Sequence, residues 1–338
     1  MAGDLGICLI GAGRAGLIHA RNFAGRVKGA RMSAIVDVNE DAARSAAKET
    51  GAERVYTHYG EALADERVQA VVVVSPTNLH RQIVVDAAAA GKHVFCEKPM
   101  AMDEAECEDM IEACRRHNVK LQIGFMRRFD ESFQRAWELV ESGSIGELVQ
   151  IHSCTRGPSK PQPWMYDLKK SNGILAEVNS HDIDSVRWFA RSEYDSLYAL
   201  GGNYRNREVA GEYPDYYDSV LMNGRMKNGV QFSIDGASYI QYGYDSRMEL
   251  VGNKGTIHVG RDSRDFVTAV TVGGGISRGF VDSWRDLFRD AYLQEDIAFA
   301  ECVLEDKAPA VSGHDGRMAV AAVLAGNRSI ASGQIVKL

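Results

Sequence analysis

The feature that most constrains the fold is a glycine-rich hexapeptide between an apolar run and a helical pattern. Residues 11–16 read Gly-Ala-Gly-Arg-Ala-Gly, directly after the apolar run 5–10 and at the start of the helical segment 15–25. In a strand–turn–helix unit the first glycine permits a tight turn and the second lets a ligand approach the backbone, while the third lets helix and strand pack closely. The pattern predicts a βαβ unit whose helix begins at an anion-binding loop.

Strand and helix patterns alternate over residues 1–125. Short apolar runs stand at 5–10, 34–37, 71–75, 93–97 and 120–124, with helical patterns at 15–25, 41–50, 83–90 and 103–117. The run that begins at Val71 is almost wholly β-branched, which is typical of a strand buried on both faces of a parallel sheet. The alternation predicts a doubly wound α/β domain of the Rossmann type over residues 1–125.

The pattern changes from residue 126 onward. Helices are expected at 131–142, 174–189, 284–305 and 315–332, and strands at 147–154, 219–226, 230–235, 247–251 and 256–259. Asn228-Gly229 is a hairpin signal between two of these strands. Grouped strands predict an α+β domain with a mostly antiparallel sheet over residues 126–338, whose C-terminal helices are candidates to pack back on the first domain.

Composition excludes several classes of protein. Of the 338 residues 45% are apolar and 25% are charged, so the chain is neither disordered nor fibrous. A net charge of −7 without a Lys/Arg run argues against a nucleic-acid partner. Because the sequence has no apolar window of about 18 residues, we expect no membrane span, and the N-terminal apolar run lacks the basic flank of a signal peptide. Six cysteines without a CxxC pair predict reduced thiols in a cytoplasmic protein: Cys8, Cys96, Cys107, Cys114, Cys154 and Cys302.

Asp37 stands at the end of the second expected strand, about 20 residues after the glycine loop. A carboxylate there can accept hydrogen bonds from the adenosine ribose of a dinucleotide and would repel a 2′-phosphate. Since no basic residue follows in 38–40, the sequence favours NAD over NADP. The alternative is a glycine turn that binds nothing beside a solvated aspartate. The predicted cofactor-binding residues of this part are Gly11, Gly13, Arg14, Ala15, Gly16 and Asp37.

Two further clusters carry candidate chemistry. Glu97-Lys98-Pro99 follows an expected parallel strand, at the edge where open α/β sheets bind ligands, and a lysine there can stabilise a developing alkoxide. On the expected helix 174–189, the residues Glu177, His181 and Asp184 share one face, so the histidine could serve as a base near neutral pH. An exposed Glu–Lys pair and a salt-bridged surface helix explain the two patterns equally well. For want of further ligands at typical spacing, we expect no metal.

These motifs together resemble the Gfo/Idh/MocA oxidoreductases. The glycine loop, the segment 75–80 (Ser-Pro-Thr-Asn-Leu-His), the Glu-Lys-Pro motif and the segment 173–184 occur in this order in that family. The chain looks most like the inositol dehydrogenase branch, and the segments 124–130, 244–247 and 312–317 strengthen the likeness. The resemblance spans essentially the whole chain. It implies a nicotinamide cofactor and a Rossmann domain followed by a large open sheet that builds homodimers or homotetramers.

The resemblance also implies roles for single residues. Lys98 matches the family lysine, which would stabilise the reacting oxygen, and His181 matches the histidine, which would take the hydroxyl proton while the hydride leaves for nicotinamide. Glu177 stands where most relatives have aspartate, and it would orient the histidine or bind a neighbouring hydroxyl. Pro99 matches a proline that is often cis in the family. The remaining implied residues are Asp184 and Arg127 at the substrate, and Ser75, Thr77, Asn78, His80, Glu97 and Lys98 at the cofactor.

The loop 157–166 departs from the corresponding loop of inositol dehydrogenases. Trp164 and Tyr166 offer flat faces that suit the C–H side of a pyranose ring, although simple loop packing explains them as well.

The sequence therefore predicts an NAD-dependent dehydrogenase that oxidises a secondary ring hydroxyl of a cyclic polyol or sugar. An inositol and a glucoside stand about equal as substrates. The alternatives are an NAD-using glycosidase of the same family and a non-catalytic NAD-binding sensor. Retention of both Lys98 and His181 argues against the sensor.

Overall fold

The computed structural model describes residues 4–261, 263–271 and 275–338, so the first three residues of the expected N-terminal domain lie outside the described residues. The chain divides into two compact units. The first unit contains residues 1–129 and 290–320, and the second contains residues 130–289 and 321–338. Within the described residues, no helix is long and apolar enough to cross a membrane.

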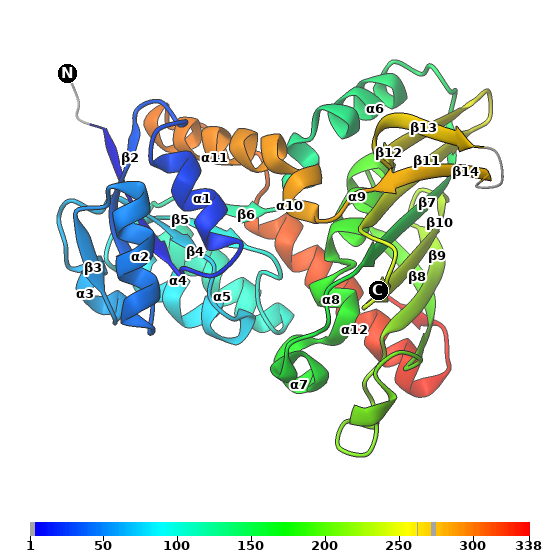
Figure 1. Cartoon of the computed structure of the whole chain (residues 1–338), viewed down its shortest axis with the longest axis horizontal. Helices are drawn as coiled ribbons and strands as arrows, with labels where there is room; N and C mark the ends of the chain where they lie inside the picture. Colours follow the sequence, from blue (N-terminus) through cyan, green and yellow to red (C-terminus); the bar gives the residue numbers. More distant parts are fainter. Residues whose placement is uncertain (1–3, 262, 272–274) are drawn as a thin grey trace. The chain divides into compact units, whose positions relative to one another are not determined.

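The first unit is built on a six-stranded sheet with the order β3-β2-β1-β4-β5-β6 (Figure 1). Every neighbouring pair in this order is parallel. The chain order reverses between β1 and β4, and ligands bind at such a switch point, beyond the carboxyl ends of the strands. The expected Rossmann fold is confirmed. The strands are β1 (Leu5–Ile10), β2 (Ala30–Val36), β3 (Arg54–Tyr56), β4 (Ala70–Val73), β5 (His93–Glu97) and β6 (Leu121–Gly124).

Helices cover both faces of this sheet. Apolar side chains of α1, α2 and α11 form one buried cluster with side chains of β1, β2, β4 and β5, and Phe23 and Phe299 are fully buried within it. Because successive side chains of a strand point to opposite faces, the other face remains for α4, which packs against β4, β5 and α5. The helices are α1 (Gly16–Phe23), α2 (Glu40–Thr50), α3 (Tyr59–Leu63), α4 (His80–Ala89), α5 (Glu104–Arg116) and α11 (Arg289–Leu304).

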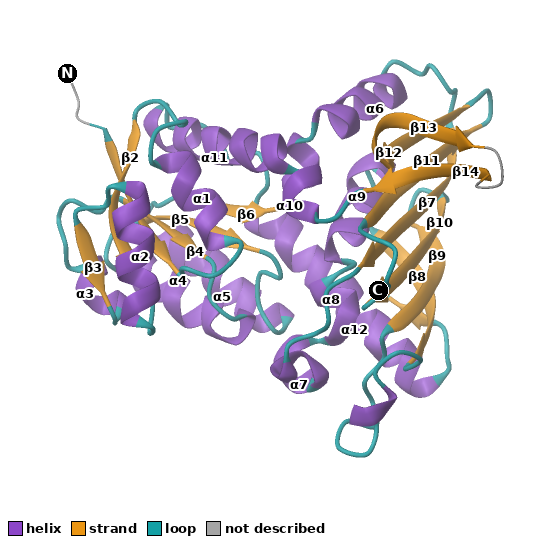
Figure 2. Cartoon of the chain, viewed as in Figure 1, coloured by secondary structure: helices purple, strands orange, loops and turns teal. Residues whose placement is uncertain are grey.

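The second unit contains a seven-stranded sheet with the order β12-β11-β7-β10-β9-β8-β15 (Figure 2). Only β7 and β10 pair in parallel, so the sheet is mixed and mostly antiparallel, as expected. The hairpin at Asn228-Gly229 joins β9 to β10, and Gly229 has the positive φ that such a turn requires. The strands are β7 (Leu148–Gly157), β8 (Tyr194–Gly202), β9 (Ser219–Met226), β10 (Gln231–Ser238), β11 (Asp245–Gly252), β12 (Thr256–Arg261) and β15 (Val336–Lys337), and β13 (Ser263–Thr271) and β14 (Gly275–Phe280) form a separate hairpin.

Two of the expected helices are interrupted. The expected helix 174–189 is wrong as one element, because α8 ends at Glu177 and α9 begins at Ser180. Asn179 lies in the break, where its side chain bonds a neighbouring carboxylate, and asparagine favours such local bonds over a helix interior. The expected helix 284–305 is divided at Phe288, whose ring is buried against Phe133 and Tyr244. The helices are α6 (Glu131–Glu141), α7 (Leu168–Ser171), α8 (Gly173–Glu177), α9 (Ser180–Ala190), α10 (Trp284–Leu287) and α12 (Gly313–Ser332).

Candidate functional site

The glycine loop joins β1 to α1, as the sequence predicts. Gly11 has a φ of +105°, and a Cβ there would lie 2.5 Å from the carbonyl oxygen of Val74. A Cβ on Gly16 would lie 2.0 Å from the carbonyl oxygen of Gly11, so both positions exclude a larger residue. A Cβ on Gly13 would instead meet no atom within 4 Å. Gly13 therefore leaves the backbone open to a ligand just before α1, where helical N–H groups favour a phosphate.

Asp37 follows β2 and faces this loop. Its Oδ2 accepts a hydrogen bond from the Ala12 N–H at 2.8 Å, and its Oδ1 accepts one from the Asn39 N–H at 2.9 Å. Arg14 is exposed and Ala15 is half-buried at the start of α1. An open stretch of backbone beside a fixed carboxylate fits the pyrophosphate and ribose of a dinucleotide.

His80 contacts both loops that follow β4 and β5. Its Nε2 lies 2.8 Å from the carbonyl oxygen of Ser75, and its Nδ1 lies 2.9 Å from that of Pro99. Burial lowers the pKa of His80, while the two carbonyl contacts oppose that shift. Thr77 is buried and Asn78 is exposed in the same turn. The Lys98–Pro99 peptide is cis, which confirms the expectation for this proline.

Glu97 is a buried residue of the first unit. Its side chain lies beneath the loop that carries Lys98, and Oε2 accepts a hydrogen bond from the Lys98 N–H at 2.9 Å. Its Oε1 lies 3.1 Å from Nε2 of His19. A Cβ on Gly124 would come within 3.0–3.1 Å of the carboxylate, so this glycine makes room for it. The exposed Glu–Lys pair allowed by the sequence is therefore wrong for Glu97, whereas Lys98 itself is half-buried.

The predicted Glu177, His181 and Asp184 face is not one helical face. Glu177 is the last residue of α8, and the other two lie on α9, one turn apart. His181 is 6% exposed and Asp184 is 1% exposed, and Glu177 is half-buried. The i, i+4, i+7 spacing does not place the three side chains on one face, because the helix is interrupted before Ser180.

Asp182, which the sequence analysis did not single out, fixes the first turn of α9 to the sheet. It is fully buried, and its Oδ1 accepts hydrogen bonds from Ser153 Oγ at 2.5 Å and from Thr155 Oγ1 at 2.9 Å, both on β7. Its Oδ2 accepts a third from Asn179 Nδ2 at 2.8 Å. This anchor sets the position of the adjacent His181 within the second unit.

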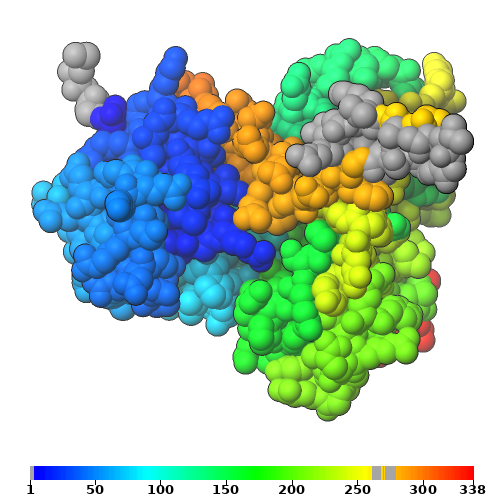
Figure 3. All heavy atoms as spheres, viewed as in Figure 1, coloured from blue at the N-terminus to red at the C-terminus, as the bar shows by residue number. Residues whose placement is uncertain are grey.

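The proline-rich loop 157–166 packs on the segment 206–217 of the same unit, and both form part of the green surface in Figure 3. Tyr166 is 7% exposed, and its ring contacts those of Tyr213 and Tyr216 at centroid distances of 6.0 and 4.9 Å. Trp164 is half-buried. The packing of Tyr166 agrees with the simpler alternative for this residue.

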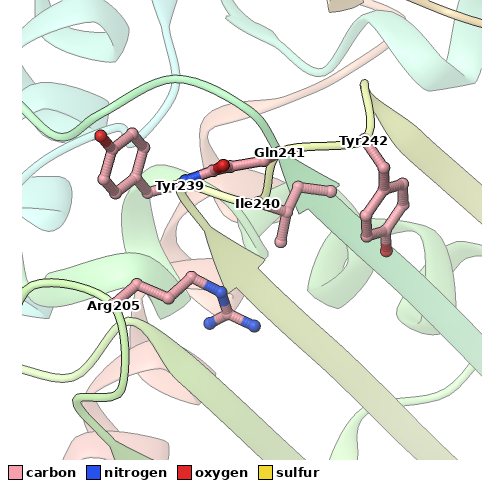
Figure 4. Close-up of a pocket in the computed structure, with 5 residues that line it drawn as sticks. All are labelled: Arg205, Tyr239, Ile240, Gln241 and Tyr242. Carbon is pink, nitrogen blue, oxygen red and sulfur yellow. The ribbon is translucent and has the colours of Figure 1, made fainter.

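A pocket of about 320 Å³ in the second unit is lined by residues that the sequence analysis did not select. Figure 4 shows Tyr239 and Tyr242 at the two ends of a short segment, with Arg205 on a neighbouring loop. The Tyr242 hydroxyl accepts a hydrogen bond from Arg156 Nη1 at 3.1 Å. Tyr239 has a φ of +58°, which is uncommon for a residue with a side chain. The lining residues are Arg205, Tyr239, Ile240, Gln241 and Tyr242.

The remaining expected substrate residue, Arg127, lies in the turn Met126–Phe129 of the first unit and is 1% exposed. All six cysteines are free thiols, and five of them are buried. Among the described residues, no group of three or more His, Cys, Asp or Glu side chains is arranged to hold a metal ion.

Residues 5–125 match the family model of an oxidoreductase family with an NAD-binding Rossmann fold, and residues 133–258 match the GFO/IDH/MocA C-terminal domain. The chain is 36% identical to myo-inositol 2-dehydrogenase of Thermotoga maritima over 332 residues, which are 98% of each protein. It is 30% identical to scyllo-inositol 2-dehydrogenase (NAD(+)) of Bacillus subtilis, over 98% of this chain and 95% of that protein.

Two solved structures have the same fold. Scyllo-inositol dehydrogenase from Lactobacillus casei, with bound NAD(H) and scyllo-inositol, matches with a TM-score of 0.90 at 28% identity, over 99% of each chain. Myo-inositol 2-dehydrogenase from Lactobacillus plantarum matches with a TM-score of 0.91 at 28% identity, over 99% of each chain.

The fold and the glycine-loop site define an NAD-dependent oxidoreductase. Within that class, the chain belongs to the GFO/IDH/MocA family. The predicted family and the predicted NAD cofactor are confirmed.

Proposed function

We propose that the protein oxidises a secondary ring hydroxyl of a cyclic polyol, with NAD as the hydride acceptor. The observation that carries this proposal is the match over 98% of the chain to a myo-inositol 2-dehydrogenase. An inositol is the first candidate substrate. A glucoside is the second, because the loop 157–166 and Glu177 differ from what the inositol dehydrogenase branch leads us to expect.

The chain's own residues supply the acid–base chemistry in this proposal. His181 takes the proton of the reacting hydroxyl, and Lys98 donates a hydrogen bond to the same oxygen, which stabilises its developing negative charge. Glu177 orients His181 or binds a neighbouring hydroxyl, and Asp184 binds a further hydroxyl. The fixed backbone around Lys98 and the anchored first turn of α9 support these roles, because a proton-transfer group must hold its position.

The cofactor is held by the first unit in this proposal. The backbone at Gly13 and the carboxylate of Asp37 hold its adenosine end and pyrophosphate, and Thr77, His80 and Lys98 stand at the other loops of the same sheet edge. NAD, when bound, supplies the hydride acceptor.

NADH formation with a small panel of substrates tests this function. The panel contains myo-inositol, scyllo-inositol, glucose and an alkyl glucoside, each with NAD and with NADP. We expect turnover with an inositol or the glucoside and with NAD rather than NADP. No turnover with any member would contradict the proposal, and cleavage of a nitrophenyl glycoside without net NADH would assign the glycosidase alternative.

We also propose that a second copy of the chain covers the open face of the seven-stranded sheet, giving a homodimer or homotetramer. Leu200 on β8 and Leu221 on β9 are directly paired, and they are 55% and 57% exposed. Their neighbours Ala199 and Met222 point to the other, buried face. An exposed pair of large apolar side chains on adjacent strands is typical of an interaction surface.

A further inference from the structure

Three titratable side chains are enclosed inside the first unit. His19 on α1 and Asp296 on α11 are fully buried, and Glu97 at the end of β5 is 5% exposed. Nδ1 of His19 lies 2.7 Å from Oδ1 of Asp296, and Nε2 lies 3.1 Å from Oε1 of Glu97. Asn22 donates a further hydrogen bond to Oδ2 of Asp296 at 2.8 Å. We call His19, Glu97 and Asp296 the buried triad.

The contacts of both ring nitrogens with carboxylates favour the imidazolium form of His19. A neutral imidazole has one N–H, so it can donate to only one of two carboxylates, whereas the imidazolium ion donates to both. Burial by itself lowers the pKa of His19, but the charge of Asp296 and the hydrogen bonds to Asp296 and Glu97 raise it well above 6.5. Removing His19 would leave two buried carboxylates without a counter-charge, so both carboxylates depend on the histidine.

The buried triad ends at the backbone of Lys98. Oε1 of Glu97 is held by His19, and Oε2 accepts the Lys98 N–H at 2.9 Å. A Cβ at position 124 would lie only 3.0–3.1 Å from the carboxylate, so a residue larger than glycine would displace it. The His19 ring is enclosed too, with its centroid 5.0 Å from that of Phe95. A continuous chain of hydrogen bonds thus runs from Asp296 through His19 and Glu97 to the peptide that carries Lys98.

We propose that His19 and Asp296 are positioning residues for Lys98: they orient Glu97, and Glu97 fixes the Lys98 peptide. This inference rests on the proposed function, in which Lys98 contacts the reacting oxygen. It assigns to the buried triad a role in turnover.

A double-mutant cycle separates positioning from stability. His19→Gln is made in the native chain and in a Lys98→Ala chain, and kcat and both KM values are measured for each. A residue that acts through Lys98 costs activity only when Lys98 is present. In the native background we expect kcat to fall about 10-fold or more, and the KM values for NAD and for the polyol to change less than about 3-fold. In the Lys98→Ala background we expect kcat to change less than about 2-fold.

Asp296→Asn is the second variant, because it keeps the size of the side chain and is the safer change for folding. The variant removes one of the two carboxylates that raise the pKa of His19, so the ring is held less firmly between residue 296 and Glu97. We expect the same non-additivity with Lys98→Ala. Tyr59→Phe is the control: it removes a hydrogen bond to Asp86 in the same unit, and kcat should not change in either background.

The outcomes distinguish the inference from the function on which it rests. If Lys98→Ala turns over like the native enzyme, the proposed role of Lys98 is wrong and the inference fails with it. If Lys98→Ala is slow but His19→Gln and Asp296→Asn cost the same factor in both backgrounds, the buried triad is structural only. That second result overturns the inference and leaves the proposed function intact.

Discussion

At the scale of the residue, burial and hydrogen-bond partners decide what a motif residue does. The placement of Gly13 and Asp37 at one loop could be predicted, because the glycine loop and the strand end are local patterns. For Glu97 the sequence left two alternatives, a residue at the ligand-binding edge and an exposed partner of Lys98, since sequence spacing does not show burial. Its partner His19 was not predicted, and Asp296 lies 277 residues further along the chain, so no local pattern connects them.

The roles of Lys98 and His181 predict a large loss of turnover in simple variants. General acid–base and electrostatic contributions are typically worth ~10²-fold or more, so Lys98→Ala or His181→Ala should each lower kcat at least ~100-fold. NADH formation measures the effect, and circular dichroism with NAD titration controls for folding. A variant with near-native kcat would remove that residue from the proposed mechanism.

The glycine loop predicts opposite outcomes for two alanine variants. Gly13→Ala adds a Cβ into open space, so the fold should be as stable as the native protein while NAD binds about 10-fold more weakly. Gly16→Ala places a Cβ 2.0 Å from the Gly11 carbonyl oxygen and should lower the unfolding temperature even without NAD. Calorimetric titration and thermal unfolding measure the pair. Native NAD affinity in Gly13→Ala would show that the cofactor does not approach this position.

At the scale of the element, tertiary partners override local helix patterns. The expected helix 174–189 is broken at Asn179, whose side chain bonds Asp182, and the helix expected over 284–305 is divided where the ring of Phe288 is buried. Period and composition could predict that helical residues occur in these segments. They could not predict the breaks, because each break depends on a side-chain partner.

The anchor of α9 predicts a stability effect in the second unit. Asp182→Ala leaves the hydroxyl groups of Ser153 and Thr155 without their acceptor, so we expect the free energy of unfolding to fall by at least about 2 kcal/mol. Denaturant unfolding measures this. The control Arg135→Ala removes an exposed ion pair with Glu138 and should change stability by less than about 0.5 kcal/mol. Equal effects of the two variants would show that Asp182 is not an anchor.

His80, which joins the loops after β4 and β5, predicts a pH effect. Burial lowers its folded-state pKa below the ordinary value of 6.5, so the unfolded chain binds more protons in that window and stability falls as the pH drops below 6.5. The native chain should therefore lose its advantage in unfolding free energy over His80→Gln as the pH falls below 7. The loss is about 1.4 kcal/mol for each pH unit by which the folded-state pKa lies below 6.5. Unfolding curves at several pH values measure it, and a constant difference would contradict a lowered pKa of His80.

At the scale of the whole molecule, the fold class followed from the alternation of strands and helices and from the grouped strands beyond residue 126. The sequence marked the C-terminal helices only as candidates to pack on the first domain, and residues 290–320 lie in the first unit. Phe299 joins the cluster formed by α1 and the sheet, and this packing partner is more than 200 residues away from Phe95 in the chain. Such pairings depend on shape, which composition and period do not encode.

The open face of the seven-stranded sheet predicts the response of assembly to one charge. Leu221 is 57% exposed, so the chain should still fold when Leu221→Glu places a carboxylate there. Because this carboxylate lies opposite Leu200, the chain should lose its self-association. Light scattering at several concentrations measures the mass. The control Leu304→Glu adds the same charge to a 48% exposed position of the first unit and should leave the assembly unchanged. An unchanged mass for Leu221→Glu would place the contact elsewhere.

The most direct test of the central claim follows the hydride itself. The enzyme is given NAD with myo- or scyllo-inositol that carries deuterium on every ring carbon, and the mass of the NADH formed is measured by mass spectrometry. Oxidation of a ring hydroxyl predicts one deuterium in each NADH molecule and slower turnover than with unlabelled inositol when the hydride step limits the rate. NADH without deuterium, or no NADH from either inositol or from a ring-deuterated alkyl glucoside, would contradict an NAD-dependent oxidation of a ring CH–OH group.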